Sequence, residues 1–252
     1  MKLIDSHCHI HESEFFDSTT QQEVYERALA ADIAMICVAT SESASKEAIA
    51  FVDKHENTWA VLGVHPHEAK HGCDLIGELL AQRHSKVVGI GEIGLDYHYN
   101  HSSPEIQHKI LEQQLQWAQD YNLPVSFHIR QAFDDFWPIF DNFHGIKGVL
   151  HSFTDSAENL EAGFSRGLYV GVNGISTFTK DNNQQQLYSS IPLEKMLLET
   201  DAPFLTPAPL RGRINEPKYI GMVAQHMADL RSVASDVVNR ATTTNARRLF
   251  DI

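Results

Sequence analysis

Short apolar runs alternate with amphipathic segments along the whole 252-residue chain. The amphipathic segments, such as residues 104–119 and 156–167, place apolar side chains at helical spacing and carry helix-end residues, Pro104 at a first turn and Gly167 at a C-terminus. Unbroken apolar strands that alternate with helices are typical of a parallel sheet covered by helices. We predict strands at residues 2–7, 34–40, 59–65, 86–92, 124–129, 147–153, 168–174 and 196–201.

Eight strand–helix units in a chain of this length predict a (β/α)8 barrel of the TIM type, which we place in a single domain over residues 1–252. An open, doubly wound parallel sheet is the alternative that the same alternation allows. The chain shows no internal repeat, low-complexity tract or linker-like stretch that would divide it.

The stretch VVGIGEIGLDYH at residues 87–98 contains a G-x-G-x-x-G pattern at Gly89, Gly91 and Gly94. A dinucleotide site needs a helix to begin at this motif, so that its first amides face the pyrophosphate. Here Glu92 lies inside the loop, and the next predicted helix begins only at residues 103–104. We therefore interpret the glycines as a means for the strand end to turn sharply and to approach a pocket closely.

Histidine and carboxylate residues follow or end most of the predicted strands. In a barrel, the C-terminal ends of all strands meet at one mouth, where active sites are built. A single histidine at a strand end is often an ordinary polar cap, but the repetition of imidazole and carboxylate groups indicates a metal site. The residues at these positions are His7, His9, His65, Glu92, His128, His151 and Asp201.

The His7-x-His9 spacing supports this interpretation. Residues two apart in an extended chain point to the same face, so both imidazoles can reach one ion. Cys8 would then point to the other face, into the core.

Composition narrows the possible partners. The net charge of −13, from 20 Lys and Arg against 33 Asp and Glu, argues against a broad basic surface for nucleic acid. A phosphate-bearing substrate would therefore meet bound cations and a few local basic side chains. The three cysteines have no C-x-x-C spacing, and no signal peptide or apolar run of membrane-spanning length is found. We expect a cytoplasmic protein with no membrane association and no obligate protein partner.

Several motifs, in order along essentially the whole chain, resemble those of the TatD-type metal-dependent hydrolases of the amidohydrolase superfamily. The resemblance implies a (β/α)8 metal hydrolase, often a 3′-to-5′ deoxyribonuclease. The motifs are DSHCH at 5–9, GVHPH at 63–67, GEIGLDY at 91–97, NLPVSFHIR at 122–130, VLHSF at 149–153, LLETDAP at 197–203 and NEP at 215–217.

The resemblance also assigns roles to residues and implies two divalent metal ions, with Mg, Mn or Zn as the candidates. The first ion would be held by His7, His9 and Asp201, and the second by His128 and His151, with Glu92 bridging them. His65, Arg130 and Arg213 match positions near the substrate. Gln131, Ser152 and Ile214 depart from residues that are frequent in the family, and none of them is an assigned ligand.

These residues predict hydrolysis by a water activated between two metal ions, with Asp201 as general base and Glu92 as bridging ligand. The expected substrate is a DNA end or another phosphoester. Hydrolysis of an ester or amide, in a small metabolite or an aminoacyl-tRNA, is the alternative on the same centre, and a structural metal protein is a third.

Asp96 and Glu199 are candidates for orienting ligand imidazoles. Aromatic residues near strand ends could stack on a base or pack in the core, namely Phe153, Phe178 and Phe204.

Overall fold

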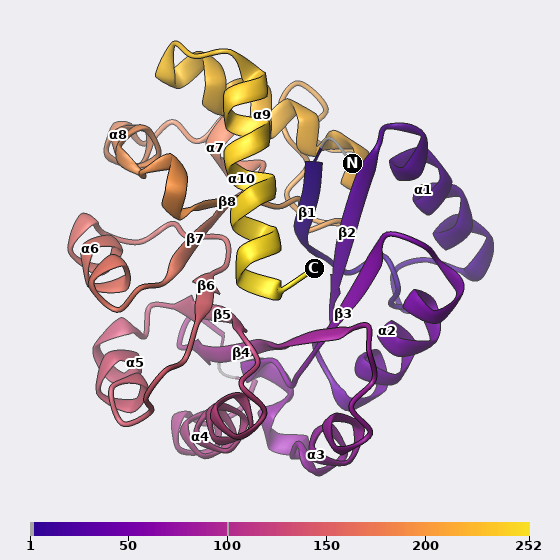
Figure 1. The fold of residues 1–252 in the computed structure, drawn as a ribbon. Helices are drawn as coiled ribbons and strands as arrows, with labels where there is room; N and C mark the ends of the chain where they lie inside the picture. Colours follow the sequence, from indigo (N-terminus) through magenta and orange to yellow (C-terminus); the bar gives the residue numbers. More distant parts are fainter. Residues whose placement is uncertain (1–2, 100) are drawn as a thin grey trace. The chain divides into compact units, whose positions relative to one another are not determined.

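The strands follow one another around a single sheet in chain order. The structure is a computed structural model that describes residues 3–99 and 101–252, and it contains an eight-stranded parallel sheet with the order β1 to β8 (Figure 1). This order, with helices between the strands, is that of a (β/α)8 barrel, so the predicted fold class is confirmed. The doubly wound alternative is wrong, since such a sheet reverses its strand order at a switch point. The predicted strand start at Lys2 lies outside the described residues.

The chain divides into two compact units, which are described separately. The terminal unit comprises residues 1–37 and 152–252, and the central unit comprises residues 38–151. Strand β2, Ile33–Val38, ends at the boundary between them. The single-domain assignment stays a prediction.

The terminal unit joins the first and the last strand of the sheet. The Thr200 amide and hydroxyl both donate to the buried Asp5 carboxylate, and the Ser6 hydroxyl donates to the Leu198 carbonyl at 2.9 Å. The C-terminal helix α10 packs against both strands (Figure 1). Apart from β2, its elements are β1 Leu3–Cys8, α1 Ser18–Ala30, α6 Ala157–Ser165, β7 Tyr169–Val172, α7 Ile175–Phe178, α8 Asn182–Ser190, η2 Leu193–Lys195, β8 Met196–Leu198, η3 Pro217–Tyr219, α9 Ile220–Arg231 and α10 Ser235–Phe250.

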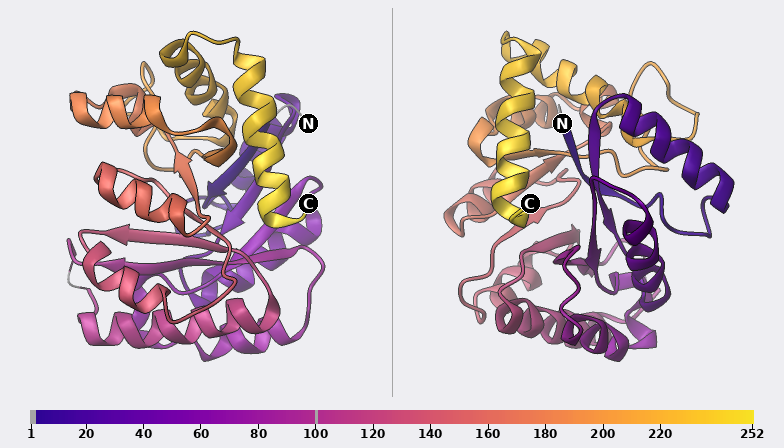
Figure 2. Two further views of the ribbon diagram at one scale, coloured as in Figure 1. Left: turned by 60° about the vertical axis from the view of Figure 1, so that its left-hand side comes forward. Right: turned by 45° about the vertical axis from the view of Figure 1, so that its right-hand side comes forward.

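The central unit is a run of parallel strands with helices between them. Helix α4 begins at Pro104 as predicted and lies along β4; it is the magenta helix at the lower edge of the left view in Figure 2. Phe127 of β5 and Phe136 of α5 are fully buried and in ring contact. The elements are α2 Glu42–Lys54, β3 Thr58–Leu62, η1 Pro66–His71, α3 Asp74–Ala81, β4 Val87–Asp96, α4 Pro104–Tyr121, β5 Val125–Arg130, α5 Phe133–Phe140 and β6 Gly148–Leu150.

Three predicted strand ends in the central unit were wrong. Strand β6 ends at Leu150 and not at residue 153, so His151 follows the strand. Strand β3 ends at Leu62, so His65 is the N-cap of the short helix η1 and not the last residue of a strand. Strand β4 continues to Asp96, four residues past its predicted end at Glu92. The sequence Gly-Glu-Ile-Gly was interpreted as the start of a turn, but it lies within an extended strand.

The glycines of β4 allow close contact with β5. A Cβ atom at Gly94 would lie 1.9 Å from the carbonyl oxygen of His128, and one at Gly91 would lie 2.8 Å from that of Ser126. No side chain fits at such distances, so glycine is required at Gly94 for the strands to pair as they do. The G-x-G-x-x-G pattern therefore serves strand packing and not the sharp turn that was predicted, and, as expected, it opens no helix.

Candidate functional site

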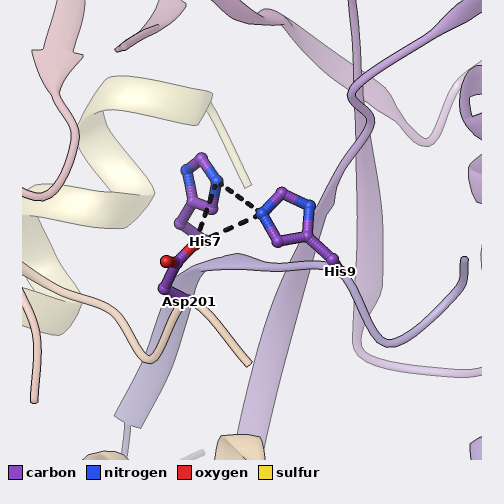
Figure 3. A group of neighbouring side chains, drawn as sticks. All are labelled: His7, His9 and Asp201. Carbon is purple, nitrogen blue, oxygen red and sulfur yellow. Dashed lines mark hydrogen bonds and ion pairs between the residues drawn. The ribbon is translucent and has the colours of Figure 1, made fainter. Parts of the chain in front are cut away.

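Three predicted ligands converge in the terminal unit (Figure 3). The Nε2 atom of His9 lies 3.2 Å from Nε2 of His7 and 3.2 Å from Oδ1 of Asp201, and His7 Nε2 lies 3.9 Å from the same oxygen. Both histidines are buried, and the Asp201 side chain is 13% exposed. We call these three residues the terminal cluster.

Backbone hydrogen bonds bring these distant residues together. The His9 amide donates to the Ala202 carbonyl at 2.8 Å, and the Asp201 amide donates to the His7 carbonyl at 2.9 Å. The segment after β8 thus continues to pair with the end of β1 beyond the last regular strand residue. Asp201 has a φ of 59°, a left-handed conformation that aspartate tolerates better than most residues, and this turns the chain directly after the pairing.

Glu12 is a functional candidate that the sequence analysis missed. Its Oε1 lies 3.4 Å from Nδ1 of His9, and its side chain is 6% exposed. The turn that places it is closed by its own amide, which donates to the His9 carbonyl at 3.1 Å. A carboxylate behind Nδ1 leaves Nε2 as the nitrogen that faces His7 and Asp201. Burial would lower the pKa of His9, but hydrogen bonds to Asp201 and Glu12 outweigh it and raise the pKa well above its ordinary value.

A second group surrounds Glu92 in the central unit. Its Oε1 lies 2.8 Å from Nδ1 of His128, 3.7 Å from Nε2 of His151 and 3.7 Å from Nε2 of His65. Glu92, His65 and His151 are buried, and the His128 side chain is 20% exposed. We call Glu92, His128 and His151 the central cluster.

Asp96 orients His128 from the other side of its ring. Its Oδ2 lies 2.9 Å from Nε2 of His128 and 3.1 Å from Nε2 of His67, while Oδ1 accepts the amides of His98 and Tyr99 at 2.9 and 3.0 Å. Burial raises the pKa of Asp96, but the hydrogen bonds from His128 and the Tyr99 amide outweigh it and hold the pKa well below its ordinary value. A charged Asp96 accepts a hydrogen bond from Nε2–H of His128, which in the neutral ring leaves the Nδ1 lone pair for a metal ion.

His65 has the opposite arrangement of its ring nitrogens. The His67 amide donates to its Nδ1 at 3.2 Å, so the neutral ring carries its proton on Nε2. Burial and the neighbouring His128 lower the pKa of His65 well below its ordinary value, which favours this neutral form. Although Nε2 is close enough to Glu92 and His128 to share an ion with them, a protonated nitrogen is a donor and not a ligand. Nε2 of His65 is therefore a hydrogen-bond donor, and the role of His65 near the substrate stays a prediction.

Divalent metal ions fit the donor atoms of these groups. Tetrahedral ligands about 2.0–2.2 Å from zinc lie about 3.3–3.6 Å from one another. The separations of 3.2, 3.2 and 3.9 Å in the terminal cluster are close to this spacing. In the central unit, the ordered His128 Nδ1 and the Glu92 carboxylate offer mixed nitrogen and oxygen ligands, which suit transition metals.

The predicted substrate-contacting arginines differ in their surroundings. Arg130 is exposed at the end of β5, and its guanidinium lies 5.1 Å from the centre of the Tyr99 ring. Arg213 is exposed in the segment after β8. Glu199 accepts the Ser152 amide at 2.7 Å, which fixes the backbone after β6; its proposed role in orienting an imidazole stays a prediction.

The three aromatic candidates also differ. Phe153 is buried and belongs to the core, whereas Phe178 lies 3.8 Å below the Arg211 guanidinium. Phe204 is 45% exposed, 6.3 Å from the His9 ring and 5.0 Å from Phe15 between ring centres. Of the three, Phe204 alone combines exposure with proximity to a candidate ligand.

Comparison with known proteins decides the family. The model of the family described as TatD related DNase matches residues 4–251. The chain belongs to this family. It is 34% identical over 258 aligned residues to an uncharacterized metal-dependent hydrolase, YabD, from Bacillus subtilis, with 99% of each chain covered. It is 33% identical to the 3′-5′ ssDNA/RNA exonuclease TatD of Salmonella typhimurium, over 92% of this chain and 93% of that one.

Solved structures of the TatD family agree with the fold. The crystal structure of YjjV, a TatD homologue from Escherichia coli K12, matches with a TM-score of 0.91 and 28% identity, and covers 100% of this chain and 98% of its own. The resemblance inferred from the motifs is thereby confirmed, and the protein is a TatD-family metal-dependent hydrolase. Among the described residues, none of the helices has the length and apolar character needed to span a membrane.

Proposed function

We propose that this TatD-family hydrolase is a phosphodiesterase that removes nucleotides from the 3′ end of single-stranded nucleic acid. The observation that carries the proposal is the presence of two groups of mixed imidazole and carboxylate donors, the terminal and the central cluster, each with a buried carboxylate behind one imidazole. An exonuclease named among the relatives, 33% identical to this chain, supports the proposal.

In this proposal, the two clusters hold a pair of divalent cations. His7, His9 and Asp201 would hold the first, and Glu92, His128 and His151 would hold the second. The fold class supports this assignment, because the C-terminal ends of barrel strands form the active site in enzymes of this architecture. Mg, Mn and Zn are the candidate metals.

Bound cations would supply Lewis acidity and lower the pKa of the attacking water. The chain itself provides the proton transfers and the orientation. Asp201 accepts the proton of the water that attacks phosphorus, since its side chain retains some solvent access and its Oδ1 lies 3.2 Å from the His9 imidazole. The bond between phosphorus and the 3′-oxygen of the preceding nucleotide then breaks, and Asp201 returns its proton to that oxygen. His65 donates its Nε2 proton to a non-bridging oxygen of the substrate phosphate. Arg130 and Arg213 bind phosphate oxygens from the exposed rim.

The experiment compares three substrates with the metal-loaded protein. A 5′-labelled single-stranded oligonucleotide, a small carboxyl ester and an aminoacyl-tRNA are each incubated with Mg, Mn or Zn. We expect a ladder of products shortened from the 3′ end, which disappears in the His128→Ala variant and remains in His144→Ala, an exposed histidine of the same unit. An intact oligonucleotide together with turnover of the ester or the aminoacyl bond would replace the nuclease proposal with the alternative hydrolase.

A further inference from the structure

An exposed group of rings lies beside the central cluster and has no assigned role. Tyr99 is 46% exposed, and His101 and Arg130 are also exposed. The Tyr99 ring centre lies 5.1 Å from the Arg130 guanidinium, 5.6 Å from the His67 ring and 5.8 Å from the His101 ring. We call Tyr99, His67, His101 and Arg130 the Tyr99 platform.

The platform continues directly from a candidate metal ligand. The His67 ring lies between the two, with its centre 6.3 Å from the His128 ring and 5.6 Å from Tyr99. His67 and His128 also share one oxygen of Asp96. The His67 ring alone therefore separates the Tyr99 ring from the ring of a proposed metal ligand, His128.

Hydrogen bonds fix the backbone on both sides of the platform. Asp96 accepts the Tyr99 amide at 3.0 Å, and the Ser102 hydroxyl donates to the His67 carbonyl at 2.9 Å. The Gln107 side chain donates to the Ser102 carbonyl at 2.9 Å and anchors this segment to helix α4. These hydrogen bonds order the backbone that carries the exposed Tyr99 ring. Less conformational entropy is then lost when a flat ligand binds to the ring.

The chemistry of the platform matches a nucleotide. An exposed aromatic face stacks on any base, and an adjacent guanidinium binds a phosphate oxygen and stacks on aromatic rings. The chain has a net charge of −13, so the Arg130 guanidinium over the exposed Tyr99 ring places a positive charge on an otherwise acidic protein. We propose that Tyr99 stacks on a base next to the scissile phosphate of a single-stranded substrate, and that Arg130 holds the phosphate of the same nucleotide; this rests on the proposed nuclease function.

The test combines two changes, the removal of bases from the substrate and the removal of the Tyr99 ring from the protein. One 5′-labelled oligonucleotide carries normal bases, and a second carries abasic sites at its last three positions. We expect kcat/KM of the wild-type protein to be about tenfold higher for the normal strand, mainly because KM is lower. Stacking of a base on an aromatic ring is strong enough to account for this difference. Tyr99→Ala should remove this preference, and Tyr99→Phe should keep it.

Tyr121→Ala is the matched control. Tyr121 also lies under a guanidinium, that of Arg83 at 5.6 Å, but it is the last residue of α4, about 26 Å along the helix from Pro104, the first. This variant should keep the base preference. Unchanged metal content and melting temperature in Tyr99→Ala would separate lost stacking from lost structure.

The outcomes separate this inference from the nuclease proposal. If wild type and Tyr99→Ala trim both strands with the same base preference, the platform is overturned and the nuclease stands. If no strand is trimmed, binding of a cleavage-resistant phosphorothioate strand decides: base-dependent affinity that is lost in Tyr99→Ala supports the platform, and affinity independent of the bases overturns it.

Discussion

The terminal and the central cluster both orient an imidazole ligand, but different backbone contacts position their residues. Each places a carboxylate behind an imidazole, Glu12 behind His9 and Asp96 behind His128, so that one ring nitrogen is directed at the site. The terminal cluster joins residues 192 positions apart through hydrogen bonds between the end of β1 and the segment after β8. The central cluster comes from β4, from β5 and from the residue after β6, and glycine sets the spacing of β4 and β5.

This difference predicts different sensitivities. In the terminal cluster, the side chains can be changed while the backbone pairing that positions them is retained. In the central cluster, the approach of β4 to β5 is itself part of the site, so a backbone change there should damage both fold and function. The two clusters can therefore be distinguished by comparing substitutions that change a reacting side chain with substitutions that disturb the backbone.

Asp201→Asn should have the largest effect on rate. The amide keeps the size of the side chain and can still accept hydrogen bonds, but it cannot accept the proton of the attacking water. We expect kcat to fall by about 10²–10⁴-fold with little change in melting temperature. Asp236→Asn, an exposed aspartate on α10, is the control and should retain activity. Full activity of Asp201→Asn at saturating metal would remove Asp201 from the mechanism.

Gly94→Ala should have the largest effect on stability. The new Cβ would lie 1.9 Å from the His128 carbonyl oxygen, which is backbone and can move only with β5. We expect the variant to lose about 3 kcal/mol of unfolding free energy, measured by urea denaturation. Gly145→Ala is the matched control, because Gly145 also has a positive φ, 77°, but open space around it; it should lose about 1 kcal/mol. Equal losses in the two variants would contradict the close-packing role of Gly94.

Asp96→Asn should weaken metal binding at the central cluster. Asparagine no longer offers His128 a charged acceptor for its Nε2 proton, so the ring loses its fixed tautomer. Replacing such a partner costs about 10–100-fold in metal affinity, which titration calorimetry with Zn would measure. Asp53→Asn serves as the control, since Asp53 pairs with His84 at a similar 2.9 Å on the exposed surface. An unchanged affinity in Asp96→Asn would show that Asp96 supports the loop and not the ligand.

The sequence pattern was sufficient to predict positions where the spacing of nearby residues determines the geometry. His7 and His9 were predicted to share a face because extended residues two apart do so, and Cys8 is buried as expected between them. The strand count and the start of α4 at Pro104 follow from equally local signals. Asp201 was placed by the barrel fold, which gathers strand ends at one mouth, and then by a family motif, since no local pattern links it to a histidine at the other end of the chain.

The remaining features depend on contacts that local patterns do not contain. The end of β4 was predicted at Glu92 because glycines usually interrupt strands, whereas here they admit a neighbouring carbonyl. The strand before His65 ends early because Pro66 begins a short helix. Glu12 was missed because its approach to His9 depends on a turn, although a glutamate three residues after a candidate ligand was a usable signal.

Glu12→Gln should have the smallest effect of the four and gives the sharpest contrast with Asp96. The Glu12 oxygen lies 3.4 Å from His9 Nδ1, farther than the 2.9 Å between Asp96 and His128 Nε2. The longer contact transmits less of the carboxylate charge to the ring, so we expect metal affinity at the terminal cluster to fall by about tenfold, the lower end for such partners. Glu14→Gln, in the same segment but exposed, should leave affinity unchanged. A larger loss in Glu12→Gln than in Asp96→Asn would show that the distance between carboxylate and ring does not determine how strongly the carboxylate supports an imidazole ligand.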